Sequence, residues 1–500
     1  ATGSTAIDDI TNEWSDGTNI TSNPDDAETI KDLAAPMISF LTIFDTDADA
    51  LIDKVMLTFS EDIDTDDGNA PVAGDFGNIT LPDGKTAILS SASFTDPGGS
   101  ASTVTITGIT GQKTKNTDGV STAIDGIKGQ WVDDHPTPSS NPDDFETIVD
   151  LAAPMISTLE IFDTDCNGEI DKLNIIFSED IDTDDGNAPV AGDFGTITLP
   201  DGTAANLSSA SFTDPAGGDD YVTITGITGQ TTKNTAIGST AIDDITIQWR
   251  DVASSPNTSV DPDEIENILD KAPPMVSKLT IYDTDADKKV DKIIVLFSEK
   301  VDTSPGGDPN KSHFGTIILP DGQTANLNSA SFTTIATGGS KEVTITGITN
   351  QATENTGVGA TGISGMTGAK WKDMADVTNT TNTGGCTPDG DEDIVDAITP
   401  EILTLTIYDT NFDGLIDKLV ITFSEKVGTD DNNPPVAADF GKITLPDGTI
   451  ADLSSASFTN PGGSASTVTI TGITGQKTKN TATGSTAIDD ITNEWSDGTN

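Results

Sequence analysis

Four short segments of the chain carry oxygen-bearing side chains at their first, third, fifth and ninth positions. They span residues 45–54, 163–172, 283–292 and 409–418, and each one ends in lysine. A loop with this spacing wraps a hard cation such as Ca²⁺, which takes six to eight oxygen ligands. We call each segment an Asp loop and predict that it holds one Ca²⁺ ion. The predicted ligands are Asp45, Asp47, Asp49 and Asp53 in the first loop, Asp163, Asp165, Asn167 and Asp171 in the second, Asp283, Asp285, Asp287 and Asp291 in the third, and Asp409, Asn411, Asp413 and Asp417 in the fourth.

Each Asp loop runs into a strand-like apolar segment that ends in Phe-Ser-Glu. The loop resembles the first nine positions of an EF-hand or dockerin loop. It departs from that pattern at the twelfth position, where a strand residue replaces the bidentate glutamate. We therefore expect the site to be closed by the glutamates of the Phe-Ser-Glu motifs, Glu61, Glu179, Glu299 and Glu425. The alternative is a solvated turn, rich in Asp and Gly, that binds nothing.

The sixth position distinguishes the four loops. It is Gly168 in the second loop and Gly414 in the fourth, but Ala50 in the first and Lys288 in the third. Glycine adopts a left-handed backbone without steric cost, whereas Lys288 also places a positive charge beside the ligands. We therefore expect the second and fourth loops to bind the ion more tightly than the third.

The spacing of the loops divides the chain into repeats. The loops begin at residues 45, 163, 283 and 409, so they are 118, 120 and 126 residues apart. Self-similarity at a fixed period indicates a repeat protein, and each unit is long enough to bury its own core. We predict the closing strand of a preceding repeat at 1–18 and four repeats at 19–135, 136–255, 256–377 and 378–500. Because residues 1–19 and 482–500 are identical, we also expect the chain to be a window cut from a longer polypeptide.

Within a repeat, alternating apolar and polar residues predict short strands. The clearest strand follows the Asp loop, where Val55, Leu57 and Phe59 share one face, and the other repeats keep that face apolar. About seven strands per repeat, with turns about every 8–12 residues, predict an all-β fold of antiparallel Ig-like β-sandwiches. Between the repeats, sequences such as Asn-Pro-Asp-Asp at 141–144 favour a short helix. We predict four sandwiches joined by short linkers with a helical turn.

A family resemblance follows from three motifs in order: Ala-Ala-Pro-Met-Ile, the Asp loop and Phe-Ser-Glu. Together they resemble the bacterial Ig-like domain of S-layer and other prokaryotic surface proteins. The Trp-x-Asp segments, such as 131–133, are similar to the closing strand of that family. The resemblance implies a secreted, non-enzymatic, tandemly repeated protein with a structural or adhesive role.

The composition is strongly acidic, with 82 acidic against 24 basic residues and a formal net charge of −58. This balance excludes nucleic acid as a partner, because phosphate binding needs clusters of lysine and arginine. No apolar run approaches the roughly 18 residues of a membrane span. Since such a charge repels itself, we expect counter-ions to be part of the folded state. The acidic loop at 62–75 and its counterparts offer a further candidate metal site.

The sequence offers no catalytic constellation. Its two histidines, His135 and His313, occupy non-equivalent positions, and no Ser/His/Asp set, HExxH motif or phosphate-binding loop occurs. We therefore expect no enzyme. The two cysteines, Cys166 and Cys386, lie at unrelated positions of different repeats, so we expect free surface thiols or, alternatively, a bond between neighbouring chains.

These observations predict an extracellular or cell-surface structural protein, a calcium-stiffened subunit of a filament, sheath or S-layer-like assembly. Its partners would be further copies of itself. The alternative is a binding module, either an adhesin stalk or a carbohydrate-binding repeat that contacts cell-surface glycans. Exposed aromatic side chains grouped on one face would favour sugar binding, and aromatic residues make up only 5% of the chain.

Overall fold

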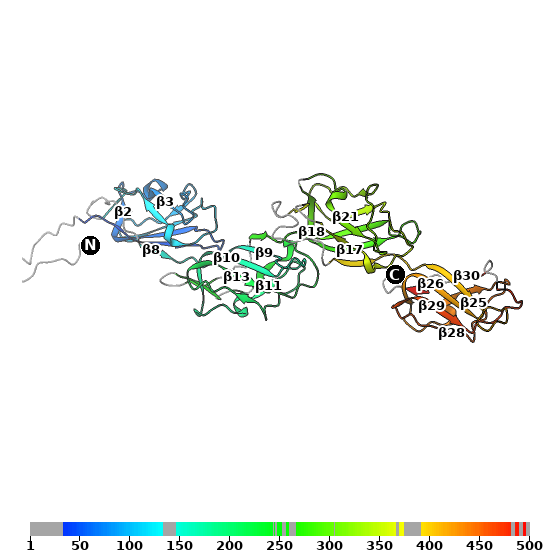
Figure 1. Cartoon of the computed structure of the whole chain (residues 1–500). Coiled ribbons are helices and arrows are strands. Elements are labelled where there is room, and N and C mark those ends of the chain that lie inside the picture. Colours follow the sequence, from blue (N-terminus) through cyan, green and yellow to red (C-terminus); the bar gives the residue numbers. More distant parts are fainter. Residues whose placement is uncertain are drawn as a thin grey trace, which may run out of the picture. The chain divides into compact units, whose positions relative to one another are not determined.

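The computed structural model of the chain describes residues 34–133, 147–243, 245, 248–252, 257–259, 267–304, 306–366, 370–374, 392–481, 486–489 and 494–496. These residues form strands and short 3₁₀ helices in an order that recurs four times (Figure 1). The chain divides into two compact units, one of residues 1–161, 172–229 and 240–269 and the other of residues 162–171, 230–239 and 270–500. The predicted all-β fold with four β-sandwich repeats is confirmed.

Each repeat supplies seven described strands of its own, and a further strand follows each of the first three repeats. The first set is β1 (Ile38–Phe44), β2 (Lys54–Thr65), β3 (Asn78–Thr80), β4 (Ser93–Phe94), β5 (Ala101–Thr107), β6 (Ala123–Asp125), β7 (Trp131–Val132) and β8 (Thr147–Asp150). The second is β9 (Ile156–Phe162), β10 (Lys172–Thr183), β11 (Thr196–Thr198), β12 (Ser211–Phe212), β13 (Asp219–Thr225), β14 (Ala241–Asp243), β15 (Trp249–Asp251) and β16 (Asn267–Asp270).

The third and fourth repeats follow the same order. The third set is β17 (Val276–Tyr282), β18 (Lys292–Thr303), β19 (Thr316–Ile318), β20 (Ser331–Phe332), β21 (Ser340–Thr346), β22 (Gly362–Ser364), β23 (Trp371–Asp373) and β24 (Asp393–Asp396). The fourth is β25 (Ile402–Tyr408), β26 (Lys418–Thr429), β27 (Lys442–Thr444), β28 (Ser457–Phe458), β29 (Ala465–Thr471), β30 (Ala487–Asp489) and β31 (Trp495–Ser496). The described 3₁₀ helices are η2 (Ala73–Phe76), η3 (Gly119–Ser121), η5 (Ala191–Phe194), η6 (Ile237–Ser239), η7 (Lys311–His313), η8 (Val358–Ala360) and η10 (Ala437–Phe440).

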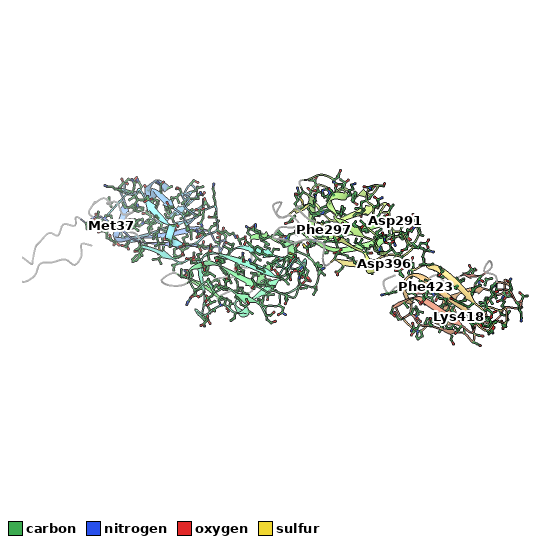
Figure 2. All side chains as sticks on the ribbon, in the orientation of Figure 1. Met37, Asp291, Phe297, Asp396, Lys418 and Phe423 are labelled. Carbon is green, nitrogen blue, oxygen red and sulfur yellow. The ribbon has the colours of Figure 1, made fainter. Side chains whose placement is uncertain are left out.

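A large sheet and a two-stranded sheet enclose the core of each repeat. In the first repeat the large sheet runs β4-β5-β2-β1-β8 with β7 also paired to β2, while β3 pairs with β6. Leu57 on β2 and Ile79 on β3 belong to one buried cluster, so the two sheets pack against each other. The alternation of β2 is as predicted, because Val55, Leu57 and Phe59 are all buried. The long strand after each Asp loop is thus the centre of its repeat; Figure 2 labels Phe297 on β18 and Phe423 on β26.

The recurring tryptophan closes this core. Trp131 is fully buried, and its ring centroid lies 5.4 Å from that of Phe59 and 5.4 Å from that of Phe76. Phe94 stacks on Phe76 at 4.8 Å, and the indole nitrogen of Trp131 donates to the carbonyl of Asp75 at 3.0 Å. The other three repeats have the same arrangement of rings.

The large sheet of each of the first three repeats is completed by a strand from the segment that follows the repeat. In the first repeat β8 pairs in parallel with β1, and β16 on β9 and β24 on β17 take the same place in the next two sheets. Residues 147–150, which were predicted to belong to the second repeat, therefore extend the sheet of the first. The predicted helical turn does not reach these residues, because pairing with the edge of β1 satisfies their backbone groups. The start of that turn, at 141–146, lies outside the described residues.

Two further findings concern the cysteines and the length of the helices. Cys166 is disulfide-bonded, which corrects the expectation of a free thiol, while Cys386 lies outside the described residues. Among the residues described above, no helical segment has the length and apolar character needed to cross a bilayer.

Candidate metal centres

The carboxylates at the first, third and fifth positions of the Asp loop converge. In the first loop, oxygen atoms of Asp45, Asp47 and Asp49 lie within 4.8 Å of one another. In the third loop the same holds for Asp283, Asp285 and Asp287. The second and fourth loops place asparagine at one of these three positions, so each offers two carboxylates and an amide oxygen. This all-oxygen donor set suits a hard cation.

Backbone amides hold the loop in this conformation. Asp45 accepts hydrogen bonds from the amides of Asp49 at 3.2 Å and Ala50 at 2.8 Å. The side chain of Gln112 anchors the end of the loop, because its Oε1 accepts from the amide of Ile52 at 3.0 Å. Burial raises the pKa of Asp45 to about 6 even though these amides lower it. A bound cation would offset that cost of ionising a partly buried acid.

The ninth-position aspartate lies apart from the other three. Asp53 accepts from the amide of Thr46 at 3.1 Å and also from the Thr46 hydroxyl. Equivalent bonds join Asp171 to Thr164, Asp291 to Thr284 and Asp417 to Thr410. Figure 2 labels Asp291, the residue just before β18. The structure therefore brings together the first, third and fifth predicted ligands, and the ninth braces the loop.

The sixth position has a left-handed backbone in all four loops. Its φ angle is +62° at Ala50, +87° at Gly168, +68° at Lys288 and +83° at Gly414. This conformation crowds the Cβ atom of any residue other than glycine. The first and third loops therefore contain backbone strain that the second and fourth avoid.

Replacing Lys288 with glycine is expected to stabilise the third loop. Lys288→Gly removes the left-handed strain, worth about 1 kcal/mol, and the positive charge beside three aspartates. It also removes the bond from Lys288 Nζ to the carbonyl of Ile402, which measures 3.1 Å. Lys288→Ala is the matched control, since it removes the charge and that bond but keeps the strain. Calcium titration by calorimetry should show tighter binding for the glycine variant than for the alanine variant; equal affinities would contradict the strain argument.

A second set of carboxylates is almost completely buried. Asp270 at the end of β16, Glu299 on β18 and Asp373 at the end of β23 are 3%, 2% and 1% exposed. Their oxygen atoms lie within 4.8 Å of one another. Asp270 accepts from the amide of Ala272 at 2.9 Å, and Glu299 accepts from the hydroxyl of Thr235 at 2.8 Å. We call this group, and its counterparts in other repeats, the buried acid cluster.

The first compact unit contains counterparts of these three residues, Asp150, Glu179 and Asp251, of which Glu179 and Asp251 are buried and Asp150 is half-buried; the convergence within 4.8 Å is found for the Asp270, Glu299 and Asp373 group. Asp150 ends β8, which belongs to the sheet of the first repeat, whereas Glu179 and Asp251 belong to the second repeat. Thr117 of the first repeat donates to Glu179 Oε1 at 2.6 Å. A cavity of about 220 Å³ opens beside Glu179 and Asp150, with Asp118, Gly119, Val120, Ile148, Asp180 and Val252 completing its lining. The cluster thus joins two consecutive repeats and has a route to solvent.

The electrostatics of these clusters are unfavourable for a folded protein without a cation. Burial and then the charge of Asp150 raise the pKa of Glu179 to about 9. Burial and then the charge of Asp251 raise the pKa of Asp150 to about 7. Glu299 also has a pKa well above its ordinary range, because of burial and then the charges of Asp270 and Asp373. A divalent cation among such groups would neutralise them at neutral pH.

Glu179 and Glu299, from the second and third Phe-Ser-Glu motifs, therefore lie in the buried acid clusters. Glu299 stands seven residues after Lys292 on the extended strand β18, roughly 23 Å along it at about 3.3 Å per residue. This separation places it far from the Asp loop that precedes the same strand. Glu179 instead faces the preceding repeat. In that repeat the amide of Asn116 donates to the carbonyl of Ala50, in the first Asp loop, at 3.0 Å. The neighbouring Thr117 binds Glu179, so one short segment contacts both acid groups.

Sequence reasoning did not assign Asp150, Asp270 or Asp396 to a site, nor the aspartates of the Trp-x-Asp segments. Their recurrence in the sequence could have indicated a site, because each aspartate returns once per repeat at a fixed place. The fourth repeat keeps Asp396 and Glu425, each 6% exposed. The candidate site in the acidic loop gains no support, because Asp75 is bound to the amide of Val72 at 2.8 Å and Asp67 to that of Asn69 at 3.0 Å.

Comparisons with known proteins give little further guidance. No protein-family model matches the chain, and no curated protein matches it either. A marsupial T cell receptor is among the solved structures found, at 9% identity, covering 62% of this chain and 91% of that one, with a TM-score of 0.12. At that TM-score the likeness carries no argument about this chain.

Proposed function

We propose that this chain is an extracellular structural repeat protein, a calcium-stiffened subunit of a surface filament, sheath or S-layer-like assembly. The observation that carries the proposal is the buried acid cluster of Asp150, Glu179 and Asp251. Two consecutive repeats contribute to it, through β8 and Thr117 on one side and β10 and β15 on the other. A cation bound there would hold the two repeats in one orientation. The chain's residues would supply only oxygen ligands, as Ca²⁺ prefers.

Ions in the Asp loops would support the same function, because each Asp loop lies at the end of its repeat opposite to the Phe-Ser-Glu glutamate. Gln112 ties the first Asp loop to the segment that reaches Glu179, because its side-chain amide donates to the carbonyl of Thr114 at 3.1 Å. Ions at the loop and at the acid cluster would therefore brace the two ends of the same short segment. The role is mechanical, since it relies on rigidity and on resistance to proteolysis.

The sugar-binding alternative gains no specific support. Phe40, Tyr221, Tyr408 and Phe412 are exposed aromatic side chains, and they lie on separate strands and loops of three repeats. The other aromatic rings named above pack inside the cores. A sugar-binding surface needs several such rings on one face, so the structural role is the function that we propose.

Imaging of the whole chain tests the proposal. Electron microscopy and small-angle scattering of the 500-residue chain would be compared in Ca²⁺, in Mg²⁺ and in NaCl of equal ionic strength. We expect Ca²⁺ to give stiff, extended particles that associate into ordered fibres or sheets. Flexible monomers in all three solutions would reject the proposed function.

A further inference from the structure

The third repeat holds the ammonium group of one of its own lysines beside the buried acid cluster. Within the second compact unit, Lys341 on β21 donates through Nζ to Oδ1 of Asn234 at 3.3 Å and to the carbonyl of Ser298 at 3.4 Å. Ser298 directly precedes Glu299 on β18. Asn234 directly precedes Thr235, whose hydroxyl donates to Glu299. The place beside these acids thus accepts a primary ammonium group, which in this repeat comes from the chain itself.

The fourth repeat has a serine where the third has this lysine. Strand β29 matches β21 in length and in its pairing with the long central strand, and Ser466 stands at the place of Lys341. A serine side chain lacks the long aliphatic stem with which a lysine reaches its acceptors. A cavity of about 440 Å³ lies at this place beside Glu425, and Ser466 is part of its lining.

The two groups that hold the lysine ammonium have counterparts in the wall of this cavity. Asn355 matches Asn234, since the side-chain oxygen of each accepts from the amide two residues later, at 3.0 Å and 3.1 Å. Ser424 matches Ser298, since the hydroxyl of each accepts from a backbone amide at 3.0 Å. Asn355 and Ser424 both line the cavity. The cavity therefore keeps the acceptor oxygens of the lysine site without the lysine.

The other lining residues suit a cation that carries a carbon chain. Asp396, labelled in Figure 2, and Glu425 both line the cavity, so a cation there would lie beside two carboxyl groups that are almost completely buried. Pro320 and Val358 add apolar surface against which a carbon chain can pack. A bare metal ion would make no use of that surface.

One basic residue also belongs to the lining. Lys426 is exposed on β26, directly after Glu425. Lys300 is the exposed residue at the same place on β18, and there the ammonium of Lys341 still bonds to Ser298. A basic residue at this place therefore does not prevent an ammonium group from binding, because water and salt screen an exposed charge.

We propose that the cavity beside Glu425 binds a primary alkylammonium ion, the chemical group that Lys341 supplies in the third repeat. The ammonium donates to Oδ1 of Asn355 and to the carbonyl of Ser424, and the carboxylate of Glu425 is the acceptor for its third hydrogen. A free aliphatic amine and a lysine side chain of another protein both carry this group. The inference goes beyond the proposed function, since it needs no filament and assigns a cation other than Ca²⁺.

Methyl resonances test the site in the whole chain. Val358 lines the cavity at the start of η8, and Ile237 stands at the matching place at the start of η6. The 500-residue chain, labelled at its valine and isoleucine methyl groups, would be titrated with n-butylammonium chloride in chelator. We expect the Val358 signals to shift and to saturate. n-Butyltrimethylammonium has the same charge but no N–H donor, so it should bind at least about tenfold more weakly. Equal affinities for the two ions would overturn the hydrogen-bonded site.

A second ligand distinguishes the source of the ammonium. Nα-acetyl-lysine methylamide carries the same aliphatic ammonium on a short piece of backbone. If it shifts the Val358 signals as n-butylammonium does, a lysine side chain of another protein can enter the cavity. If n-butylammonium alone shifts them, the ligand is a free aliphatic amine. Either result supports the inference, because both place a primary ammonium in the cavity.

Exchange of the residues at the two places locates the ammonium. Ser466→Lys should fill the cavity with a tethered ammonium, whose high local concentration weakens n-butylammonium binding at Val358 by at least about tenfold. Thr467→Lys, at an exposed position of the same strand, is the matched control for charge and should leave the binding unchanged. Lys341→Ser should open a further site, so that n-butylammonium shifts the Ile237 signal, which stays still in the original chain. Val358 signals that do not shift, or that shift equally in the Ser466→Lys variant, would overturn the inference.

Discussion

In chelator, the chain is expected to lose stability as the pH rises from about 4.5 to about 9, the ordinary and the raised pKa of Glu179. Excess Ca²⁺ is expected to abolish that loss. The reason is the buried acid cluster, in which Glu179, which is 7% exposed, must ionise next to Asp150 and Asp251. A cation among the three oxygens would make the ionised form the favourable one.

The sign of the effect follows from proton linkage. Because the folded chain holds the Glu179 proton more tightly than the unfolded chain, protonation stabilises the fold at pH values below 4.5. The stabilisation declines above that pH and is lost once the pH exceeds the raised pKa. By pH 7 the loss is on the order of 3 kcal/mol for one such group, which corresponds to a lower melting temperature by on the order of 10 °C.

Thermal unfolding of the whole chain at pH 5 and pH 8 measures this effect, with chelator or excess Ca²⁺ in buffers matched with NaCl. The melting temperatures with and without Ca²⁺ should differ far more at pH 8 than at pH 5. An equal difference at both pH values would show that calcium does not stabilise the chain by binding to the buried acids. If NaCl stabilised the chain as well as Ca²⁺ does, the acidic groups would be only a solvated surface that binds no specific ion.

Much of the fold follows from local sequence pattern. The alternation at Val55, Leu57 and Phe59 fixes which face of β2 enters the core, because successive side chains point to opposite faces. Trp131 is the only tryptophan of its repeat and recurs once in each repeat, as a residue that closes a core should. The converging carboxylates of the Asp loop could also be predicted, since the first, third and fifth positions lie close together in any tight turn of this length.

The buried acid cluster could not be predicted in the same way. It depends on β8, a strand of four residues whose partner β1 lies more than 100 positions earlier in the chain, at residues 38–44. A segment of four residues is too short to show a hydrophobic period that distinguishes a strand from a helix. The Asn-Pro-Asp-Asp sequence before it also favoured a helix. Only the pairing with β1 brings Asp150 to Glu179, which the sequence pattern had paired with the Asp loop at the other end of its strand.

Replacing Glu299 with glutamine is expected to have opposite effects with and without calcium. In chelator, Glu299→Gln should stabilise the chain, because it removes the charge of a side chain that is 2% exposed and lies beside Asp270 and Asp373. The glutamine carbonyl can still accept the hydroxyl of Thr235, now at 2.8 Å from Glu299 Oε1, and the new amide can donate to the neighbouring carboxylates of Asp270 and Asp373. The gain should be roughly 1–3 kcal/mol.

In excess Ca²⁺ the same variant should be less stable than the original chain. It loses a charged ligand and with it the stabilisation by the bound ion, about 2.7 kcal/mol at a concentration 100 times the dissociation constant. Urea unfolding in both solutions measures the two differences, and Glu342→Gln on the exposed face of β21 is the matched control for charge. The control should change stability little in either solution. A Glu299→Gln variant that is stabilised equally in chelator and in Ca²⁺ would show that the buried acids hold no ion, and calcium would then have to act through the Asp loops alone.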